Sequence, residues 1–370
     1  MSESFDAIVV GAGAMGTAAA RSLATRGRSV LVLERFEVGH ALGSSGGPTR
    51  IFRLTYEHAD HVRMARRALG AWRELEAAAG DELLTITGGI EIGAPEQRIE
   101  ALDAAGERSE RLSGREAMQR WPMLRLPDDS RVMFQSESGV CRAERTVRVQ
   151  ARLALELGAT ILEGTKVEAI EPRPNGAVVS TGGEAYHAPA VILTAGAWAA
   201  GLLKGIGIDV PLVPSLEQVA YFELEGPPSS PFPTVIDWTR DLAHPLYTVP
   251  DPLAPGDFKI GNHATGPAVD PDAGPFERDD ARAERLVAYA RERFGPHRPT
   301  GRSDPCLYTN TPDEDFVIDR AGPIVVGSPC SGQGFKFVPL IGEILADLAM
   351  GENPPVPLDR FSLGRDALRT

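Results

Sequence analysis

The chain has 370 residues, of which 42% are hydrophobic and 24% charged, a composition typical of a soluble α/β protein large enough for two domains. Its 51 acidic residues outnumber its 38 basic ones, and the net charge of −13 argues against a surface that binds nucleic acid or anionic membranes. Three cysteines without metal-ligand spacing exclude a disulfide framework, and no apolar run suits a signal peptide or membrane span. We therefore expect a cytoplasmic protein without a structural metal.

The first predicted elements form a β-turn-α-β unit: strand 7–10, turn 11–16, helix 17–25 and strand 29–33. The turn reads G-x-G-x-x-G. Gly11 makes a tight bend, Gly13 lets the backbone approach a pyrophosphate, and Gly16 lets the helix pack against the strand. Glu34 ends the second strand, where an acid can bind ribose hydroxyls. The unit predicts a dinucleotide site.

The hydrophobic pattern predicts further elements along the chain. A polar, glycine-rich loop spans residues 39–49. Residues 86–93 alternate like an edge strand, and residues 95–121 resemble a surface helix-turn-helix. Helices are expected at 61–79, 143–157, 278–294 and 340–349, and strands at 160–162, 167–171, 177–180, 191–194, 218–223, 258–261 and 324–326.

Between residues 211 and 312 prolines are dense and strands alternate, which favours a second, largely antiparallel domain. We therefore expect an α/β fold in which a mainly antiparallel α+β substrate domain (86–139 and 213–304) is inserted into a Rossmann-like FAD-binding domain (1–85, 140–212 and 305–370). Closure by a distant carboxy-terminal segment, and the long Gly/Ser/Arg loop after Glu34, favour FAD over NAD.

Arg50 and Arg53 stand three residues apart beside small residues, with Ile51 and Phe52 between them. On the first turn of a helix, this spacing would place both guanidinium groups on one side. Apolar neighbours favour a buried pair over solvated arginines, and the guanidinium fork suits a carboxylate.

Four separated motifs together resemble the monomeric sarcosine oxidase and N-methyltryptophan oxidase group of FAD-dependent amine oxidases, which also includes pipecolate oxidases. The resemblance extends from Phe5 to about Leu363. The motifs are the glycine turn with Met15; Gly43-Ser44 with Thr49-Arg50-Ile51-Phe52-Arg53; Lys259-Ile260-Gly261-Asn262-His263; and Cys306-Leu307-Tyr308-Thr309 with Ser331-Gly332-Gln333-Gly334-Phe335-Lys336-Phe337.

This resemblance implies an oxidase of a small secondary α-amino acid, such as sarcosine, another N-methyl amino acid or a cyclic imino acid. Hydride would pass to flavin N5, and dioxygen would then be reduced to hydrogen peroxide. In this group the enzyme is expected to be a monomer.

The resemblance also implies roles for individual residues. Cys306 would form a thioether to the flavin, Lys259 would activate dioxygen, and Arg53 with Lys336 would bind the substrate carboxylate. Arg50 would lie near the flavin ring, and His263, Tyr247 and Tyr308 would surround the substrate. The expected FAD contacts are Gly11, Gly13, Met15, Gly16, Glu34, Arg35, Ser44, Thr49, Arg50, Val167, Gly196, Trp198, Cys306, Gly332, Gly334, Phe335 and Lys336.

Three positions depart from the sarcosine oxidase pattern. Gly46 and Gln333 replace histidines, and Ser45 also differs. These changes enlarge or neutralise the region around the substrate amine, so a bulkier or cyclic amino acid is as plausible as sarcosine. The alternatives are a flavin dehydrogenase with another acceptor, a biosynthetic enzyme that desaturates a cyclic amino acid, an NAD-dependent dehydrogenase and a non-catalytic flavin-binding module.

Overall fold

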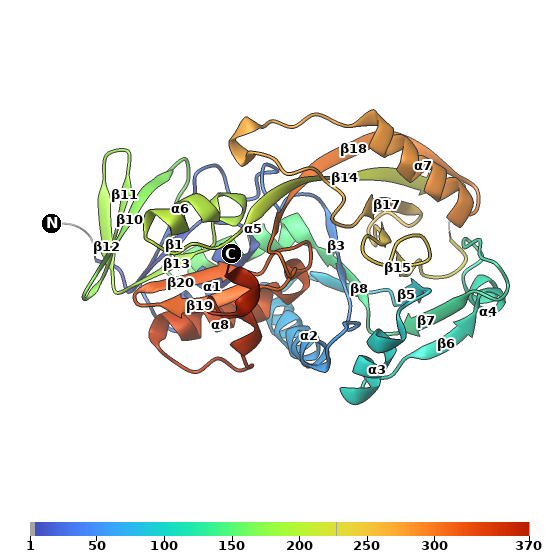
Figure 1. Cartoon of the computed structure of the whole chain (residues 1–370), viewed down its shortest axis with the longest axis horizontal. Coiled ribbons are helices and arrows are strands. Elements are labelled where there is room, and N and C mark those ends of the chain that lie inside the picture. Colours follow the sequence, from blue (N-terminus) through green and yellow to red (C-terminus); the bar gives the residue numbers. More distant parts are fainter. Residues whose placement is uncertain (1–3, 227, 370) are drawn as a thin grey trace.

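The computed structural model describes residues 4–226 and 228–369, which form two lobes joined by long strands (Figure 1). The first lobe is built on a six-stranded sheet in the order β19-β20-β13-β1-β2-β9. All its pairings are parallel except β19 with β20. The bounds are β1 (Ala7–Val10), β2 (Val30–Leu33), β9 (Thr160–Leu162), β13 (Ala190–Leu193), β19 (Val317–Ala321) and β20 (Ile324–Ser328).

The central strands β1, β2 and β13 are buried at every position, which explains why the sequence shows continuous apolar runs there. One face of the sheet is covered by three helices, α1 (Ala14–Thr25), α5 (Ala143–Glu156) and α8 (Val338–Met350). The other face packs against α6 (Ala199–Gly205) and a three-stranded sheet of β10 (Val167–Arg173), β11 (Gly176–Thr181) and β12 (Ala185–Ala188). This layered arrangement confirms the predicted Rossmann-like fold.

The second lobe is built on an eight-stranded sheet in the order β18-β14-β17-β16-β15-β5-β7-β6. It is antiparallel except where β15 pairs with β5. The bounds are β5 (Gly89–Ile92), β6 (Glu110–Ser113), β7 (Arg131–Gln135), β14 (Val213–Leu224), β15 (Thr234–Asp237), β16 (Leu246–Pro250), β17 (Asp257–Asn262) and β18 (His297–Asn310).

Helix α7 (Asp280–Arg293) covers one face of this sheet over a core rich in phenylalanine, including Phe222, Phe258 and Phe294. The opposite face of the sheet is turned toward the cavity described below. The long pair β14 and β18 extends across the top of Figure 1 toward the first lobe. Because β18 stays paired with β14 through Asn310, we propose that the chain returns to the FAD-binding domain after residue 310.

A small sheet of β3 (Thr49–Phe52), β8 (Gly139–Arg142) and β4 (Leu84–Ile86) lies beside α2 (Ala59–Ala79). Two further helices, α3 (Glu96–Ala104) and α4 (Gly114–Arg120), complete the second lobe. Among the described residues, no helix is both long and apolar enough to cross a membrane.

Three local predictions were wrong. Residues 86–93 do not form one edge strand, because β4 ends at Ile86 and the buried β5 lies between two other strands. Residues 95–121 form helix, strand and helix, since β6 pairs with β7 between α3 and α4. The pair Arg50 and Arg53 is not helical, because Thr49–Phe52 pairs with β8 as a strand.

Helices α1 and α8 cross at a glycine. A Cβ atom added at Gly342 would lie 2.6 Å from the backbone carbonyl of Ala18, closer than any packed side chain tolerates. This contact matters for function because α1 carries the glycine turn at its amino end.

We expect Gly342→Ala to lower the free energy of unfolding by about 1 to 3 kcal/mol, because the extra methyl group forces the two helices apart. Chemical denaturation of the purified protein measures the change. Gly70→Ala is the matched control: Gly70 is exposed on α2 and a Cβ there meets nothing within 4 Å. That control is expected to be neutral or slightly stabilising, and equal losses in both variants would contradict the close-packing argument.

Candidate active site

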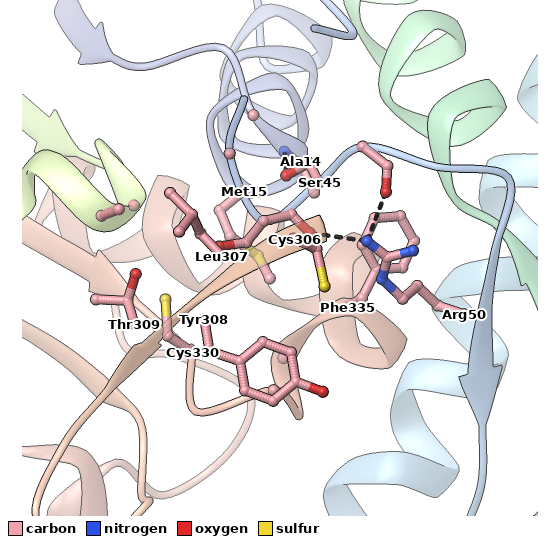
Figure 2. A pocket seen from close by; sticks show the side chains of 18 of the residues that line it. Ala14, Met15, Ser45, Arg50, Cys306, Leu307, Tyr308, Thr309, Cys330 and Phe335 are labelled. Atoms are coloured by element: carbon pink, nitrogen blue, oxygen red, sulfur yellow. Dashed lines mark hydrogen bonds between the residues drawn. The ribbon is translucent and has the colours of Figure 1, made fainter. Parts of the chain in front are cut away.

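A cavity of about 1500 Å³ lies between the two lobes, and both lobes contribute to its walls. The glycine turn and the loop of residues 39–50 form one end. Strands β16, β17 and β18 form the side wall, and the segment 329–336 lines the cavity next to Met15 of the glycine turn. Figure 2 shows the part of the cavity where Arg50, Cys306, Tyr308 and Phe335 face one another. Its volume exceeds that of an ordinary drug-sized pocket, which indicates a large ligand.

The glycine turn has the geometry that its sequence predicts. Gly11 has a φ of 96°, and a Cβ at Gly16 would lie 1.8 Å from the Gly11 carbonyl oxygen. The Glu34 carboxylate accepts the backbone N–H groups of Ala12 (2.6 Å) and Phe36 (2.8 Å), so it is fixed beside the turn. A dinucleotide fits this cradle, because the three glycines leave the backbone of the turn accessible and the acid is already oriented.

Two hydroxyl groups nearby also fit a polar ligand. Ser44 Oγ and Thr309 Oγ1 are buried in the cavity wall and have no hydrogen-bond partner within the described parts of the chain. Buried hydroxyls are normally satisfied, so each orphaned group marks a place where a ligand can contribute a partner.

Arg50 is held by backbone carbonyl groups. Its guanidinium donates to the carbonyl oxygens of Thr49 (2.8 Å), Ser44 (3.0 Å) and Gly46 (2.6 Å), two of them drawn as dashed lines in Figure 2. Lys259 Nζ donates to the same Thr49 carbonyl at 2.6 Å. Two cations thus share one carbonyl oxygen at the junction of the lobes.

Lys259 is placed by the eight-stranded sheet. It lies on β17 opposite Val249 on β16, and only 5% of its surface is exposed. Burial, followed by the nearby Arg50 guanidinium, lowers the pKa of Lys259 well below its usual range. Lys259 is therefore a buried lysine that lines the cavity and not an exposed strand residue.

Cys306 and Tyr308 are two residues apart on β18, so their side chains lie on the same face of the strand, and both line the cavity. In Figure 2 the Cys306 thiol lies between the Arg50 guanidinium and the Tyr308 ring. Burial raises the pKa of the Cys306 thiol, whereas Arg50 and Lys259 act to lower it. Cys330 differs, because its sulfur accepts a hydrogen bond from Ser328 Oγ at 3.4 Å.

Tyr308 packs among three groups from different segments. A Cβ at Gly332 would lie 2.2 Å from its ring, and its centroid is 5.7 Å from that of His263. Burial raises the pKa values of both Tyr308 and the neighbouring Tyr247, so both hydroxyls remain protonated at neutral pH. His263 Nε2 lies 3.7 Å from a carboxylate oxygen of Glu314, and hydrogen bonding to this histidine lowers the pKa of Glu314.

Arg53 and Lys336 meet at the far end of the cavity. Lys336 Nζ donates to the Gln333 carbonyl at 2.6 Å, and an Arg53 nitrogen lies 3.5 Å from the Gln333 side-chain oxygen. The two cations lie 4.9 Å and 5.8 Å from the ring centroid of Tyr56. Gln333, which replaces a histidine expected from the resemblance, therefore links the two cations.

A polar cluster behind Arg53 escaped the sequence analysis. Glu91, 3% exposed on β5, lies 3.6 Å from Arg53 and accepts hydrogen bonds from Thr55 Oγ1 and from Trp238 Nε1 (2.9 Å). These residues come from three distant segments, and no motif signalled that they would meet.

A contact between the lobes was also missed. Asp272, from the segment after β17, pairs with Arg35 (2.6 Å) and accepts from Trp198 Nε1 (2.8 Å). Arg35 and Trp198 were expected to contact FAD, and both line the cavity together with Val167 and Gly196. A segment of the second lobe therefore reaches the end of the cavity formed by the glycine turn.

A family model described as FAD dependent oxidoreductase matches residues 6–348. The chain belongs to this family. It is 33% identical to monomeric sarcosine oxidase of Bacillus sp. (strain B-0618), over 100% of this chain and 98% of that protein. It is 30% identical to N-methyl-L-tryptophan oxidase of Salmonella arizonae, over 98% of this chain and 99% of that protein.

The comparison of solved structures agrees with the family match. The structure matches that of NikD, described as an unusual amino acid oxidase essential for nikkomycin biosynthesis, with a TM-score of 0.87, 28% identity and 98% coverage of each chain. These findings confirm the predicted resemblance, the FAD cofactor and the enzyme class, a FAD-dependent amine oxidase acting on CH–NH bonds.

The buried charge of Lys336 should lower the free energy of unfolding. Burial, and next the charge of Arg53, lowers the pKa of Lys336 well below its usual range. A cation whose pKa falls on folding destabilises the folded state fully at low pH, and this cost disappears as pH rises through the unfolded pKa of about 10.4.

We therefore expect Lys336→Met to raise the free energy of unfolding by on the order of 1 to 3 kcal/mol at neutral pH, with the gain shrinking as pH approaches 10. Chemical denaturation at several pH values measures it. Lys204→Met, at an exposed position on α6, is the control and should show no such gain. A loss of stability in Lys336→Met would show that the buried charge is compensated.

Proposed function

We propose that the protein uses FAD to oxidise a small secondary α-amino acid at its CH–NH bond and passes the electrons to dioxygen. The observation that carries this proposal is the buried pair Arg53 and Lys336, which lies in the same cavity as the dinucleotide turn. Relatives named for the oxidation of sarcosine and N-methyl-L-tryptophan support a secondary amine.

In this proposal Arg53 and Lys336 bind the substrate carboxylate. Both are cations with little solvent around them, so their attraction for an anion is strong, and Gln333 holds them in a fixed relation. Anchoring the carboxylate fixes the position of the neighbouring C–H bond, and such positioning is a large part of what an enzyme site contributes.

The amine must be neutral before it can be oxidised. The cations around the cavity lower the pKa of a bound ammonium group, and the protonated hydroxyls of Tyr247 and Tyr308 offer hydrogen bonds without adding charge. His263 lies against Tyr308 and completes the polar surroundings of the amine.

We propose that the glycine turn holds the FAD pyrophosphate, Glu34 its ribose, and Arg50 with the segment 332–336 its ring. When bound, FAD accepts a hydride equivalent from the substrate carbon. The amino end of the 3-10 helix Gly334–Phe337, which leads into α8, adds a positive dipole at this end of the cavity. The oxidised substrate leaves as an imine, which water hydrolyses.

Lys259 is the proposed site of dioxygen reduction. Its ammonium group is fixed by the Thr49 carbonyl, so it requires no reorganisation to stabilise negative charge as dioxygen gains electrons. Two electrons and two protons convert dioxygen into hydrogen peroxide. The same buried cation, with Arg50, would help Cys306 to form a thiolate. Its sulfur would replace one hydrogen of the flavin 8-methyl group, and the two electrons left on the flavin would pass to dioxygen.

One observation favours a second candidate, the oxidation of a cyclic amino acid in a biosynthetic pathway. The chain lacks the two histidines expected from the resemblance, since Gly46 and Gln333 stand there, and it shares its fold with NikD. Both candidates use the same cations, and they differ in the shape of the substrate alone.

Anaerobic mixing with amino acids tests the proposal. Sarcosine, larger N-methyl amino acids, proline or pipecolate should bleach the flavin absorbance, and air should restore it with release of peroxide. Lys259→Met should slow reoxidation on the order of 100-fold, because a fixed cation is lost, with a much smaller effect on bleaching. Unchanged reoxidation in this variant would remove Lys259 from the oxygen step, and bleaching without peroxide would favour a dehydrogenase.

Acid precipitation tests the covalent bond. Yellow colour should stay in the pellet of the wild-type protein and of Cys330→Ser, and should move to the supernatant in Cys306→Ser. Cys330 is a matched control because it also lines the cavity yet already has a hydrogen-bond partner. Colour released from the wild-type protein would show that the flavin is bound without a thioether.

A further inference from the structure

Arg98 is a third buried cation beside the proposed carboxylate site. It lies on α3, is 6% exposed and lines the same cavity as Arg53. Its guanidinium stacks 4.2 Å from the Trp238 ring centroid. Arg98 and Arg53 donate to the same carbonyl oxygen, that of Thr55, at 3.3 Å and 2.9 Å, so the two guanidinium groups are immediate neighbours.

The charges in this part of the cavity do not balance. Arg53, Arg98 and Lys336 contribute three buried cations, and Glu91 is the buried carboxylate among them. Glu57 pairs with Arg98 at 3.2 Å, but its side chain is 49% exposed, so solvent screens the pair. A substrate with one carboxylate would leave a buried positive charge in excess, which is costly in a site of low polarity.

Two donors at this place also lack acceptors. The Nε–H of Arg98 and the hydroxyl of Tyr56 are both buried, and neither has a hydrogen-bond partner in residues 4–226 and 228–369. Burial raises the pKa of Tyr56, opposed by Arg53 and then by Arg98, so the hydroxyl keeps its proton near both guanidinium groups. A second anionic group would accept hydrogen bonds from these buried donors and would offset the excess of positive charge.

We propose that the substrate is a dicarboxylic secondary amino acid, whose second carboxylate is bound by Arg98 and the Tyr56 hydroxyl. This inference rests on the proposed function, since Arg53 and Lys336 bind the first carboxylate. Because Arg53 and Arg98 are neighbours, the two carboxylates must be close, as in an N-alkylated aspartate or glutamate. Trp238 fixes the plane of the Arg98 guanidinium, and its own N–H is held by Glu91.

The competing interpretation gives Arg98 a positioning role. Its bond to the Thr55 carbonyl could simply hold the segment that follows Arg53, and its loss would then weaken every substrate alike. Comparing a diacid with its neutral isostere separates the two interpretations, because positioning affects both compounds and charge recognition affects one.

The test uses the holoenzyme and anaerobic flavin reduction by N-methyl-L-glutamate and N-methyl-L-glutamine. We expect the diacid to have a kcat/KM on the order of 100-fold above that of the amide, because the amide leaves the site's charge unmatched. Arg98→Gln should reduce this ratio to about 1. Arg111→Gln is the control, since Arg111 is exposed and pairs with Glu96 at the start of the same helix, and the ratio should not change.

An unchanged ratio in Arg98→Gln, or a wild-type preference for the amide, would overturn the inference while leaving the proposed function intact. Failure of every amino acid to reduce the flavin would overturn both. If Arg98→Gln does not fold, Tyr56→Phe serves instead, because it removes a hydroxyl that holds no other residue. This variant should lower the ratio about 5-fold, and an unaltered ratio there would also overturn the inference.

Discussion

Positive charge buried without matching negative charge is the constraint on which this active site depends. Removing a guanidinium or ammonium group from water is costly, and side-chain carboxylates normally offset the cost. In this site, backbone carbonyl oxygens offset much of the cost of burying the cations. Thr49 binds both Arg50 and Lys259, and Thr55 binds both Arg53 and Arg98. Carbonyl dipoles hold a cation in place without neutralising it, so the cavity keeps its attraction for anions.

This requirement explains the irregular backbone around the site. Carbonyl groups that point inward to cations cannot pair in a sheet, so the segments that carry them are loops or strand ends. The backbone is also irregular at Ser331, which is left-handed with a φ of 53°: its N–H donates to the Thr309 carbonyl and its hydroxyl accepts from the Thr311 N–H. Such conformations persist only where surrounding bonds enforce them, and here they precede Gln333 and Lys336.

The sequence predicted the parts of the molecule that depend on local pattern. The glycine turn, its flanking strands and α8 follow from runs of adjacent residues, and the roles proposed for Lys259 and Cys306 come from motif resemblance. The strand at Arg50 was mistaken for a helical turn because its partner β8 lies ninety residues later. The sequence did not predict four site residues, because each contacts a partner that is far away in the chain. They are Glu91, Arg98, Trp238 and Asp272.

Both lobes contribute side chains to the whole cavity: Arg53 and Lys336 come from segments next to the first lobe, and Asp272 of the second lobe reaches the glycine-turn end. Local sequence on the parallel sheet builds the FAD end, so its motif is recognisable. Glu91, Arg98 and Trp238 are brought together by packing between α3, β5 and the loop after β15, so no run of adjacent residues signals this cluster. Glu91 illustrates the balance, since Thr55 and Trp238 engage its oxygens as well as Arg53. Its negative charge orients Arg53 but is shared among donors, and the guanidinium therefore remains able to bind a substrate anion.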